Sequence, residues 1–392
     1  MNHKTEKISL SFSVALLMFP QVIETMYSPA LTSIKAQFGV STSTAAQALS
    51  VFFIAFAFGV IFWGRMCDVI GRRQSMLGGL AVLTIGSCSA LIASNFNILL
   101  CSFAVCAFGA AVGSICTQTM IRDSYQGKDL AHVFTIAATS IGISPVVGLL
   151  LGSWLTAQGG YLWVFATMVA FILVLSIWCF ARLPETKPAH TQKDSLISIA
   201  IKMSRDSTIW YTVAMISFFN VALFSYYSIA PFMFEDMGLG VDYFGNTGFI
   251  IALGSIAGSF INSRLLKMEM SDTNIVRIAS LLLLISAVSV YCLQSTQWFF
   301  VPMALVSLAF GLAIPHIMGN ALVNYRDHLG SAGALLGSFY YLLIGAGLEF
   351  ANHIGDLGEV LIACSVLAVS LMLLSAAKGA LTTKTQLEGM EY

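Results

Sequence analysis

The sequence is short of charge. Only 10% of its 392 residues are Asp, Glu, Lys or Arg, whereas soluble domains carry about 25%. The 19 basic and 19 acidic residues cancel, and 57% of the chain is hydrophobic. So few charges cannot cover a water-soluble surface, and no basic face is available for a nucleic acid. The same composition excludes a disordered chain. We therefore expect lipid to be the solvent for much of the surface.

Several sequence patterns of enzymes and metal sites are also missing. The eight cysteines lie in or beside apolar stretches and include no CxxC pair, so neither a disulfide framework nor a metal site is predicted. The chain has no GxxxxGK[ST] phosphate loop and no HExxH or GxSxG motif. We therefore expect no enzyme, no cofactor and no direct use of ATP.

Apolar stretches long enough to cross a bilayer as helices fill the chain. About 20 apolar residues span the ~30 Å hydrocarbon core as a helix. The twelve predicted spans are 8–28, 45–63, 74–94, 97–120, 131–157, 161–181, 208–233, 244–264, 275–294, 298–321, 332–352 and 357–377. They do not alternate in polarity as barrel strands would. The predicted fold class is an all-α membrane protein with twelve transmembrane helices.

The basic residues lie almost entirely on one side of this arrangement. With the spans as drawn, 18 of the 19 Lys and Arg residues share a side with both termini, and only Lys35 lies opposite. By the positive-inside rule both termini are cytoplasmic. A missed or extra span would have mixed the two groups, so the partition supports twelve spans in a multi-pass protein.

The longest polar stretch, 182–207, divides the chain in two. It contains two prolines and five basic residues. The predicted units are an N-terminal six-helix half (1–181), a cytoplasmic linker (182–207), a C-terminal six-helix half (208–377) and a cytoplasmic tail (378–392). Many secondary transporters consist of two such halves around a site near the membrane midplane.

The loop between the second and third spans carries the most specific motif. Its sequence, GRMCDVIGRR, resembles the G-x-L-a-D-r-x-G-R-[RK] signature of the major facilitator superfamily. The matching residues are Gly64, Asp68, Gly71, Arg72 and Arg73. The resemblance implies a conformational switch in which Arg72 pairs with Asp123 and Asp68 faces the N-terminal dipole of the eleventh span. The alternative is a plain basic anchor. Arg122, which lies beside Asp123 in the sequence, is expected to form a gate or anchor ion pair at the cytoplasmic end of its helix.

A second motif lies in the fifth span, in the sequence SIGISPVVGLLLG. Pro145 is expected to bend the helix, and Gly148 and Gly152 to allow close helix contact. The stretch partly resembles the superfamily's antiporter motif, G-x-x-x-G-P-x-x-G-G, although serines replace two of its glycines. The resemblance implies export by antiport, and ordinary tight packing is the alternative.

Three stretches resemble Bcr/CflA-type drug-resistance transporters. They are TMYSPAL at 25–31, GSICTQTMIRD at 113–123 and GSAGALLG at 330–337. The resemblance implies a monomer in a bacterial inner membrane that exports small organic compounds. Thr25 stands where that branch has a membrane Asp, so its proton coupling cannot simply be transferred.

Glu24 and Glu349 are acidic residues within the predicted spans, and no Lys or Arg lies deep in any span. A charge at mid-bilayer costs ~2.5–3.5 kcal/mol, so each needs a reason. Glu24 is the leading candidate for proton coupling or cation binding, and a packing or interfacial role is the alternative. Glu349, near the outer end, is expected to be interfacial. His316 is a second candidate for proton coupling, unless it is a buried neutral imidazole.

Polar and aromatic side chains recur in the spans expected to line a cavity. The predicted substrate-binding residues are Tyr27, Gln118, Phe219, Asn220, Tyr226, Tyr227, His316, Asn320, Tyr340 and Tyr341. An aromatic cavity with a few hydrogen-bonding groups suits a moderately apolar organic molecule. Each residue taken singly could instead face lipid or pack in the core.

The predicted function is secondary active transport, most simply proton-coupled export by alternating access. Its partners would be a small molecule, protons and membrane lipid. Two alternatives stay open, namely a dedicated exporter of a natural product such as a siderophore and a proton symporter for a metabolite such as a nucleoside. No selectivity-filter loop suggests a channel.

Overall fold

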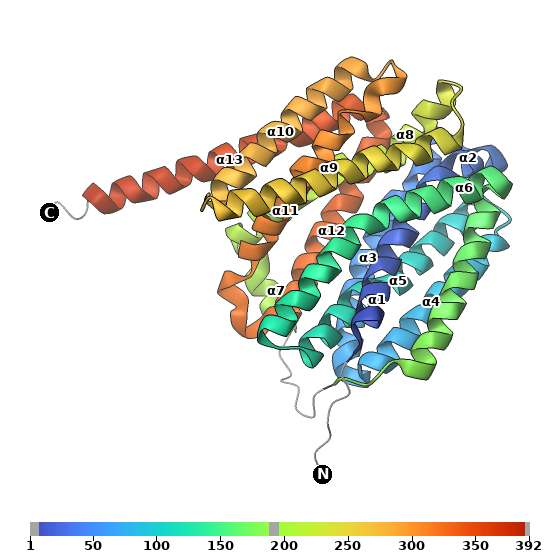
Figure 1. The fold of residues 1–392 in the computed structure, drawn as a ribbon, viewed down its shortest axis with the longest axis horizontal. Helices are drawn as coiled ribbons and strands as arrows, with labels where there is room; N and C mark the ends of the chain where they lie inside the picture. The colour runs from blue at the N-terminus through green and yellow to red at the C-terminus, as the bar shows by residue number, and fades with distance from the viewer. Residues whose placement is uncertain (1–7, 188–195, 389–392) are drawn as a thin grey trace, which may run out of the picture.

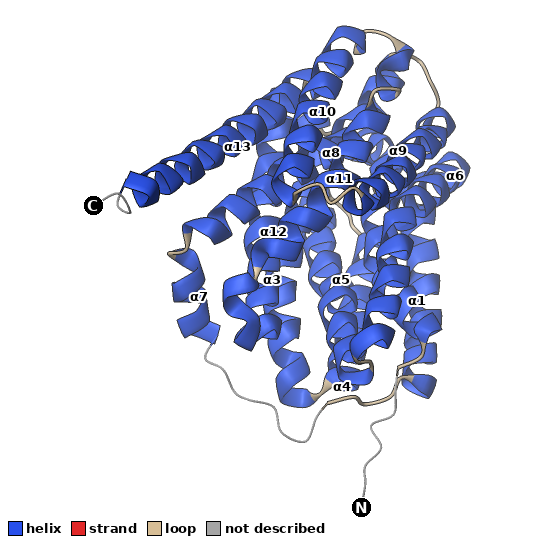
Figure 2. Ribbon diagram, turned by 60° about the vertical axis from the view of Figure 1, so that its left-hand side comes forward, coloured by secondary structure: helices blue, strands red, loops and turns tan. Residues whose placement is uncertain are grey.

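The computed structural model describes residues 8–187 and 196–388, and this part of the chain is helical with no strand (Figure 2). The elements are α1 (Leu10–Met26), η1 (Ser28–Ala30), α2 (Leu31–Phe38), α3 (Thr42–Ile70), α4 (Arg72–Leu91), α5 (Phe96–Ser124), α6 (Gly127–Arg182), α7 (Leu196–Ser204), α8 (Ser207–Asp236), α9 (Val241–Lys267), α10 (Asp272–Leu293), η2 (Gln297–Phe300), α11 (Met303–Ala321), η3 (Val323–His328), α12 (Leu329–Ile354) and α13 (Leu357–Glu388). Among the described residues, 11 helices are long and apolar enough to cross a membrane.

The longest of these helices, α6, contains two of the predicted spans. Its 56 residues are interrupted at Gly159 and Gly160, whose backbone angles are not helical. Gly160 has φ 64°, a left-handed conformation that glycine adopts without a steric penalty. Figure 1 shows the chain reversing direction at this break. The break falls between the predicted spans 131–157 and 161–181, so the chain crosses twelve times.

The first crossing is longer than predicted. Helix α1 is followed by the 3-10 turn η1, which contains Pro29, and then by α2, which ends at Gly39 with φ 62°. The apolar segment therefore runs over Leu10–Phe38. At the other end of the chain, α13 continues to Glu388, so residues 378–388 of the predicted tail extend the last helix.

The twelve crossings form two groups, α1–α6 and α8–α13 (Figure 1). In the first group α1 packs on α6, and α5 packs on α3 and α4. In the second group α9 packs on α11, and α10 packs on α13. The groups meet where α3 contacts α12 and where α6 contacts α9. Within the predicted linker, α7 packs against α8 and α12 and buries Ile199 and Met203 there.

Polar contacts between the two groups gather at the ends of helices that lie away from the basic loops. Lys35 of α2 forms an ion pair of 3.1 Å with Glu235 at the end of α8. Gln47 of α3 donates a hydrogen bond of 2.9 Å to Glu349 of α12. Asn352 of α12 donates to Ser50 of α3 at 3.1 Å. The two groups are therefore fastened together at the face opposite the basic one.

Candidate functional site

The α3–α4 turn is made by a single glycine. Helix α3 ends at Ile70 and α4 begins at Arg72, so Gly71 alone reverses the chain, with φ 105°. Residues other than glycine rarely adopt this backbone conformation. A Cβ atom at this position would also lie 2.5 Å from the Glu185 carboxylate. Both the backbone and its neighbour therefore require glycine here.

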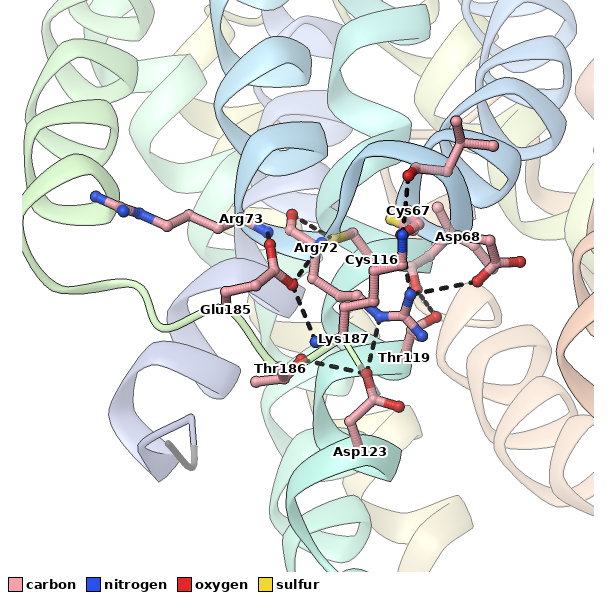
Figure 3. Close-up of polar contacts among 12 residues, drawn as sticks. Cys67, Asp68, Arg72, Arg73, Cys116, Thr119, Asp123, Glu185, Thr186 and Lys187 are labelled. Carbon is pink, nitrogen blue, oxygen red and sulfur yellow. Dashed lines mark hydrogen bonds and ion pairs between the residues drawn. The ribbon is translucent and has the colours of Figure 1, made fainter. Parts of the chain in front are cut away.

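Arg72 is the centre of a buried ionic network (Figure 3). Its side chain is 3% exposed, and its Nε donates to Asp123 at 2.8 Å. Its Nη1 donates to the Cys67 carbonyl at 2.9 Å and lies 3.4 Å from the Asp68 carboxylate. The expected Arg72–Asp123 ion pair is therefore present. It joins the end of α3, the start of α4 and the end of α5.

Glu185 completes this network, and our sequence reasoning missed it. Its carboxylate accepts hydrogen bonds from the backbone N–H groups of Arg72 at 2.9 Å and Arg73 at 3.2 Å. These N–H groups belong to the first turn of α4, which has no intrahelical acceptors for them and carries the positive end of the helix dipole. Thr186 donates to Asp123 at 3.2 Å, and Lys187 donates to the Val69 carbonyl at 2.9 Å. The segment after the sixth crossing thus contacts the α3–α4 turn and the end of α5 (Figure 3).

Other predicted switch residues have separate contacts. Gly64 faces the second group, because a Cβ atom there would lie 3.6 Å from Ala334 of α12. Arg73 donates to the Phe180 carbonyl at 2.6 Å. Arg122 places its guanidinium 5.6 Å from the Phe134 ring centroid, whereas Asp123 is paired with Arg72. Asp68 has a side chain that is 41% exposed and lies 3.4 Å from Arg72 Nη1; its expected contact with the N-terminal dipole of the eleventh span stays a prediction.

The fifth-span motif lies against α1. A Cβ atom at Gly148 would overlap the Thr25 hydroxyl and lie 2.5 Å from the Val22 carbonyl. One at Gly152 would overlap the Met26 carbonyl oxygen. These glycines therefore let the backbones of α6 and α1 touch, as expected for small residues at membrane-helix contacts. Thr25 itself donates to the Gln21 carbonyl of its own helix at 2.9 Å.

Gly148→Ala should destabilise the protein by about 1–3 kcal/mol, because the added methyl group overpacks the α1–α6 contact. Gly142→Ala is the matched control on the same helix, since a Cβ atom there meets no other atom within 4 Å. Thermal unfolding in detergent should show a lower midpoint for Gly148→Ala alone. Equal midpoints for the two variants would show that the α1–α6 contact accommodates the methyl group without a loss of stability.

Glu24 lies at the interface between the two groups of helices. Its side chain is 3% exposed, and no hydrogen-bond partner for its Oε1 is found among the described residues. It acts electrostatically on the hydroxyls of Tyr227 of α8 and of Tyr340 and Tyr341 of α12. An ionised carboxylate here would be a buried charge without a countercharge, which costs several kcal/mol.

Aromatic rings from both groups pack on the three tyrosines that lie within electrostatic range of Glu24. Tyr341 lies 4.5 Å from Tyr340 and 4.8 Å from Phe56 of α3 between ring centroids. Phe224 of α8 lies 4.8 Å from Phe53 and 5.7 Å from Tyr227. Tyr340 and Tyr341 are only partly buried, as are two other predicted substrate residues, Gln118 and Asn220. The structure therefore brings one carboxyl and several predicted aromatic residues together.

Other predicted substrate residues are packed in the core in this conformation. Tyr27 lies among Phe52, Phe103 and Phe165 and is 1% exposed. Tyr226 is fully buried, and its hydroxyl is 2.6 Å from that of Thr247. Phe219 is 1% exposed. These three side chains cannot touch a substrate without a rearrangement, so their predicted role rests on another conformation.

His316 lies in a polar cluster of the second group, and its hydrogen-bond partners do not include Glu24. Its Nδ1 is 2.7 Å from Asp272 of α10, and its Nε2 is 2.6 Å from Asn262 of α9. Asn320 donates to the same Asp272 at 2.7 Å. Both ring nitrogens are therefore occupied by side chains. His316 and Asn320 hold three helices together here.

Two six-helix groups that meet at a polar and aromatic interface have the architecture of a secondary transporter. The family model of the Major Facilitator Superfamily matches residues 12–348, and the chain belongs to this superfamily. It is 29% identical over 384 residues to an uncharacterized transporter of Rickettsia bellii, covering 93% of this chain and 95% of the relative. It is also 24% identical over 336 residues to a bicyclomycin resistance protein homolog of Haemophilus influenzae, covering 82% and 83%.

A solved structure has the same fold. The crystal structure of a bacterial homolog of the human lysosomal transporter Spinster, in an inward-facing and unoccupied conformation, matches with a TM-score of 0.70. The match covers 94% of this chain and 96% of that one at 14% identity, so the likeness concerns the fold alone. The predicted fold class is therefore confirmed, and so is the resemblance to drug-resistance transporters.

Proposed function

We propose that this protein is a proton-coupled exporter of small organic compounds that works by alternating access. The observation that carries the proposal is the Glu24 carboxyl, which is buried where the two groups of helices meet and has no countercharge among the described residues. A group in this position prefers to be neutral when it is enclosed and to ionise when water reaches it. Proton binding and release at Glu24 would then follow the opening of the interface.

The contacts between the groups support alternating access. They gather at the face opposite the basic loops, through Lys35–Glu235, Gln47–Glu349 and Ser50–Asn352. If the basic face is cytoplasmic, as the positive-inside rule indicates, these contacts close the external side in an inward-facing state. Opening that side would require all three to break, while the halves close around the basic loops.

The surroundings of Glu24 favour a substrate that is aromatic or moderately apolar, and neutral or cationic. The rings of Tyr340 and Tyr341, which are partly buried, offer stacking surfaces and hydroxyl groups near one carboxyl. Tyr227 is 1% exposed and would take part only after a rearrangement. A cation or an N–H donor could replace the proton as the partner of the carboxylate. Competition of substrate and proton for Glu24 would make the transport an exchange, in keeping with the partial antiporter motif around Pro145.

Flux in inside-out membrane vesicles tests the proposal. An acid-interior pH gradient should drive accumulation of ethidium, a lipophilic aromatic cation, or of bicyclomycin, a neutral compound. Dissipating the gradient with nigericin should release the compound. Vesicles without the protein control for passive uptake. Accumulation only in right-side-out vesicles, driven by an acid exterior, would contradict export and identify an uptake symporter instead.

A further inference from the structure

A groove runs along the outside of the second group of helices, between the start of α8 and the end of α13. Its volume is about 790 Å³. The residues that line it are Arg205, Ser207, Thr208, Trp210, Tyr211, Leu371, Leu374 and Ser375. Figure 2 shows α13 passing the turn that joins α7 to α8. The residues that line this groove include neither Glu24 nor any residue of the Arg72 network.

One part of the groove is apolar and exposed. Leu374 of α13 is 62% exposed and Trp210 of α8 is 46% exposed. The Trp210 ring is held in place, because its Nε1 donates to the Ser204 carbonyl at 2.8 Å and its face stacks on Phe339 at 5.6 Å. Both helices are membrane-spanning, so these side chains face hydrocarbon, and tryptophan is typical of the membrane–water boundary.

The other part of the groove is basic and polar. Arg205 is exposed and forms no ion pair within the described residues. Lys202 of α7 does not line the groove, since its Nζ lies 5.0 Å from the Tyr325 ring centroid. One carboxylate, Asp206, is nearby, but its oxygens accept hydrogen bonds from the Thr208 backbone at 2.9 Å and the Tyr325 hydroxyl at 3.0 Å. Arg205 is thus a basic side chain of the groove lining without an ion pair among the described residues, while the nearby carboxylate is engaged elsewhere.

We propose that this groove binds one anionic phospholipid of the leaflet that meets the basic face. The lipid phosphate would pair with the Arg205 guanidinium, whose planar fork suits phosphate oxygens, and would accept hydrogen bonds from the Ser207 and Thr208 hydroxyls. An acyl chain would lie along Leu371, Leu374 and the Trp210 ring. An apolar wall that ends in unpaired basic charge is complementary to such a lipid, and basic pockets at this depth are known to hold anionic headgroups.

Trp210 supplies a probe inside the groove. The full-length protein would be reconstituted in phosphatidylcholine bilayers and titrated with dibrominated phosphatidylglycerol or dibrominated phosphatidylcholine, which quench tryptophan on contact. The difference between wild type and Trp210→Phe isolates the Trp210 signal from the other five tryptophans. Since one basic residue contributes about 1 kcal/mol to anionic lipid binding, phosphatidylglycerol should quench Trp210 at about fivefold lower mole fraction than phosphatidylcholine.

Arg205→Gln should remove this preference, whereas Arg264→Gln, at an exposed arginine of α9, should leave it intact. Arg205 is exposed, so the variant is expected to fold, and its thermal midpoint checks this. Equal quenching of Trp210 by the two lipids would mean ordinary annular contact and overturn the proposal. A preference that survives in Arg205→Gln, or no quenching of Trp210 at all, would overturn it as well.

Discussion

Glu24→Gln is expected to reduce transport driven by a pH gradient to background, while binding of a neutral compound such as bicyclomycin survives. Glutamine preserves the size and the hydrogen-bonding edge of the side chain but cannot exchange a proton. The wild-type carboxyl is 3% exposed, and its Oε1 has no hydrogen-bond partner among the described residues. Folding therefore does not depend on its charge, and the thermal midpoint should stay equal or rise. Proteoliposomes with an imposed pH gradient measure the flux, and a thermal-shift titration with the transported compound measures binding.

The matched control for this variant is Glu349→Gln. Glu349 is another acidic residue that we predicted within a span, but its side chain is 33% exposed and accepts a hydrogen bond from Gln47. Its loss should leave gradient-driven transport largely intact. Undiminished flux in Glu24→Gln would eliminate the coupling role of Glu24. A loss of both flux and binding would instead indicate that Glu24 holds the substrate without carrying the proton.

Arg72→Ala is expected to lower stability by about 3–5 kcal/mol and to stop transport. The reason is that removal of one partner strands a buried charge, here the Asp123 carboxylate, whose side chain is 13% exposed. The backbone N–H of residue 72 can still donate to Glu185, so the contact between Glu185 and the start of α4 should remain. Thermal unfolding in detergent and vesicle flux measure the two effects. Arg65→Ala, at an exposed arginine of the same loop, should change neither.

The double variant Arg72→Ala with Asp123→Ala separates stability from switching. Without either charge no carboxylate is stranded, so part of the lost stability should return. Transport should not return if the pair acts as a conformational switch. Recovery of transport in the double variant would reduce the pair to a packing role. A stability loss equal to the sum of the two single losses would show that the charges are not coupled.

The crossings were predictable because each follows from its own residues. A run of about 20 apolar residues must form a helix in lipid, since every backbone polar group needs an internal partner there. The reversal at Gly159–Gly160 was located by the gap between two such runs, and its glycines fit the non-helical backbone. The first crossing was predicted too short, because α2 continues past Pro29 through residues that are less apolar.

The contents of the site were predictable only in part. The Arg72–Asp123 pair was expected from the resemblance of the loop, and it is present. Glu185 was missed, since nothing near it in the sequence links it to a loop more than 100 residues away. His316 was expected in the cavity, but both of its ring nitrogens contact side chains of α9 and α10. No local pattern identifies such partners.

The sequence by itself determined that this protein lies in a membrane, how many times it crosses and which face carries its basic residues. These properties depend on the free energy of transferring each segment from water to lipid, and that free energy follows from the residues of the segment itself. Only the tertiary structure decided that Glu24 is buried with no countercharge among the described residues and that tyrosines of α8 and α12 lie within electrostatic range of it. Those neighbours come from the other half of the chain, so their placement depends on how two separately formed groups of helices pack together.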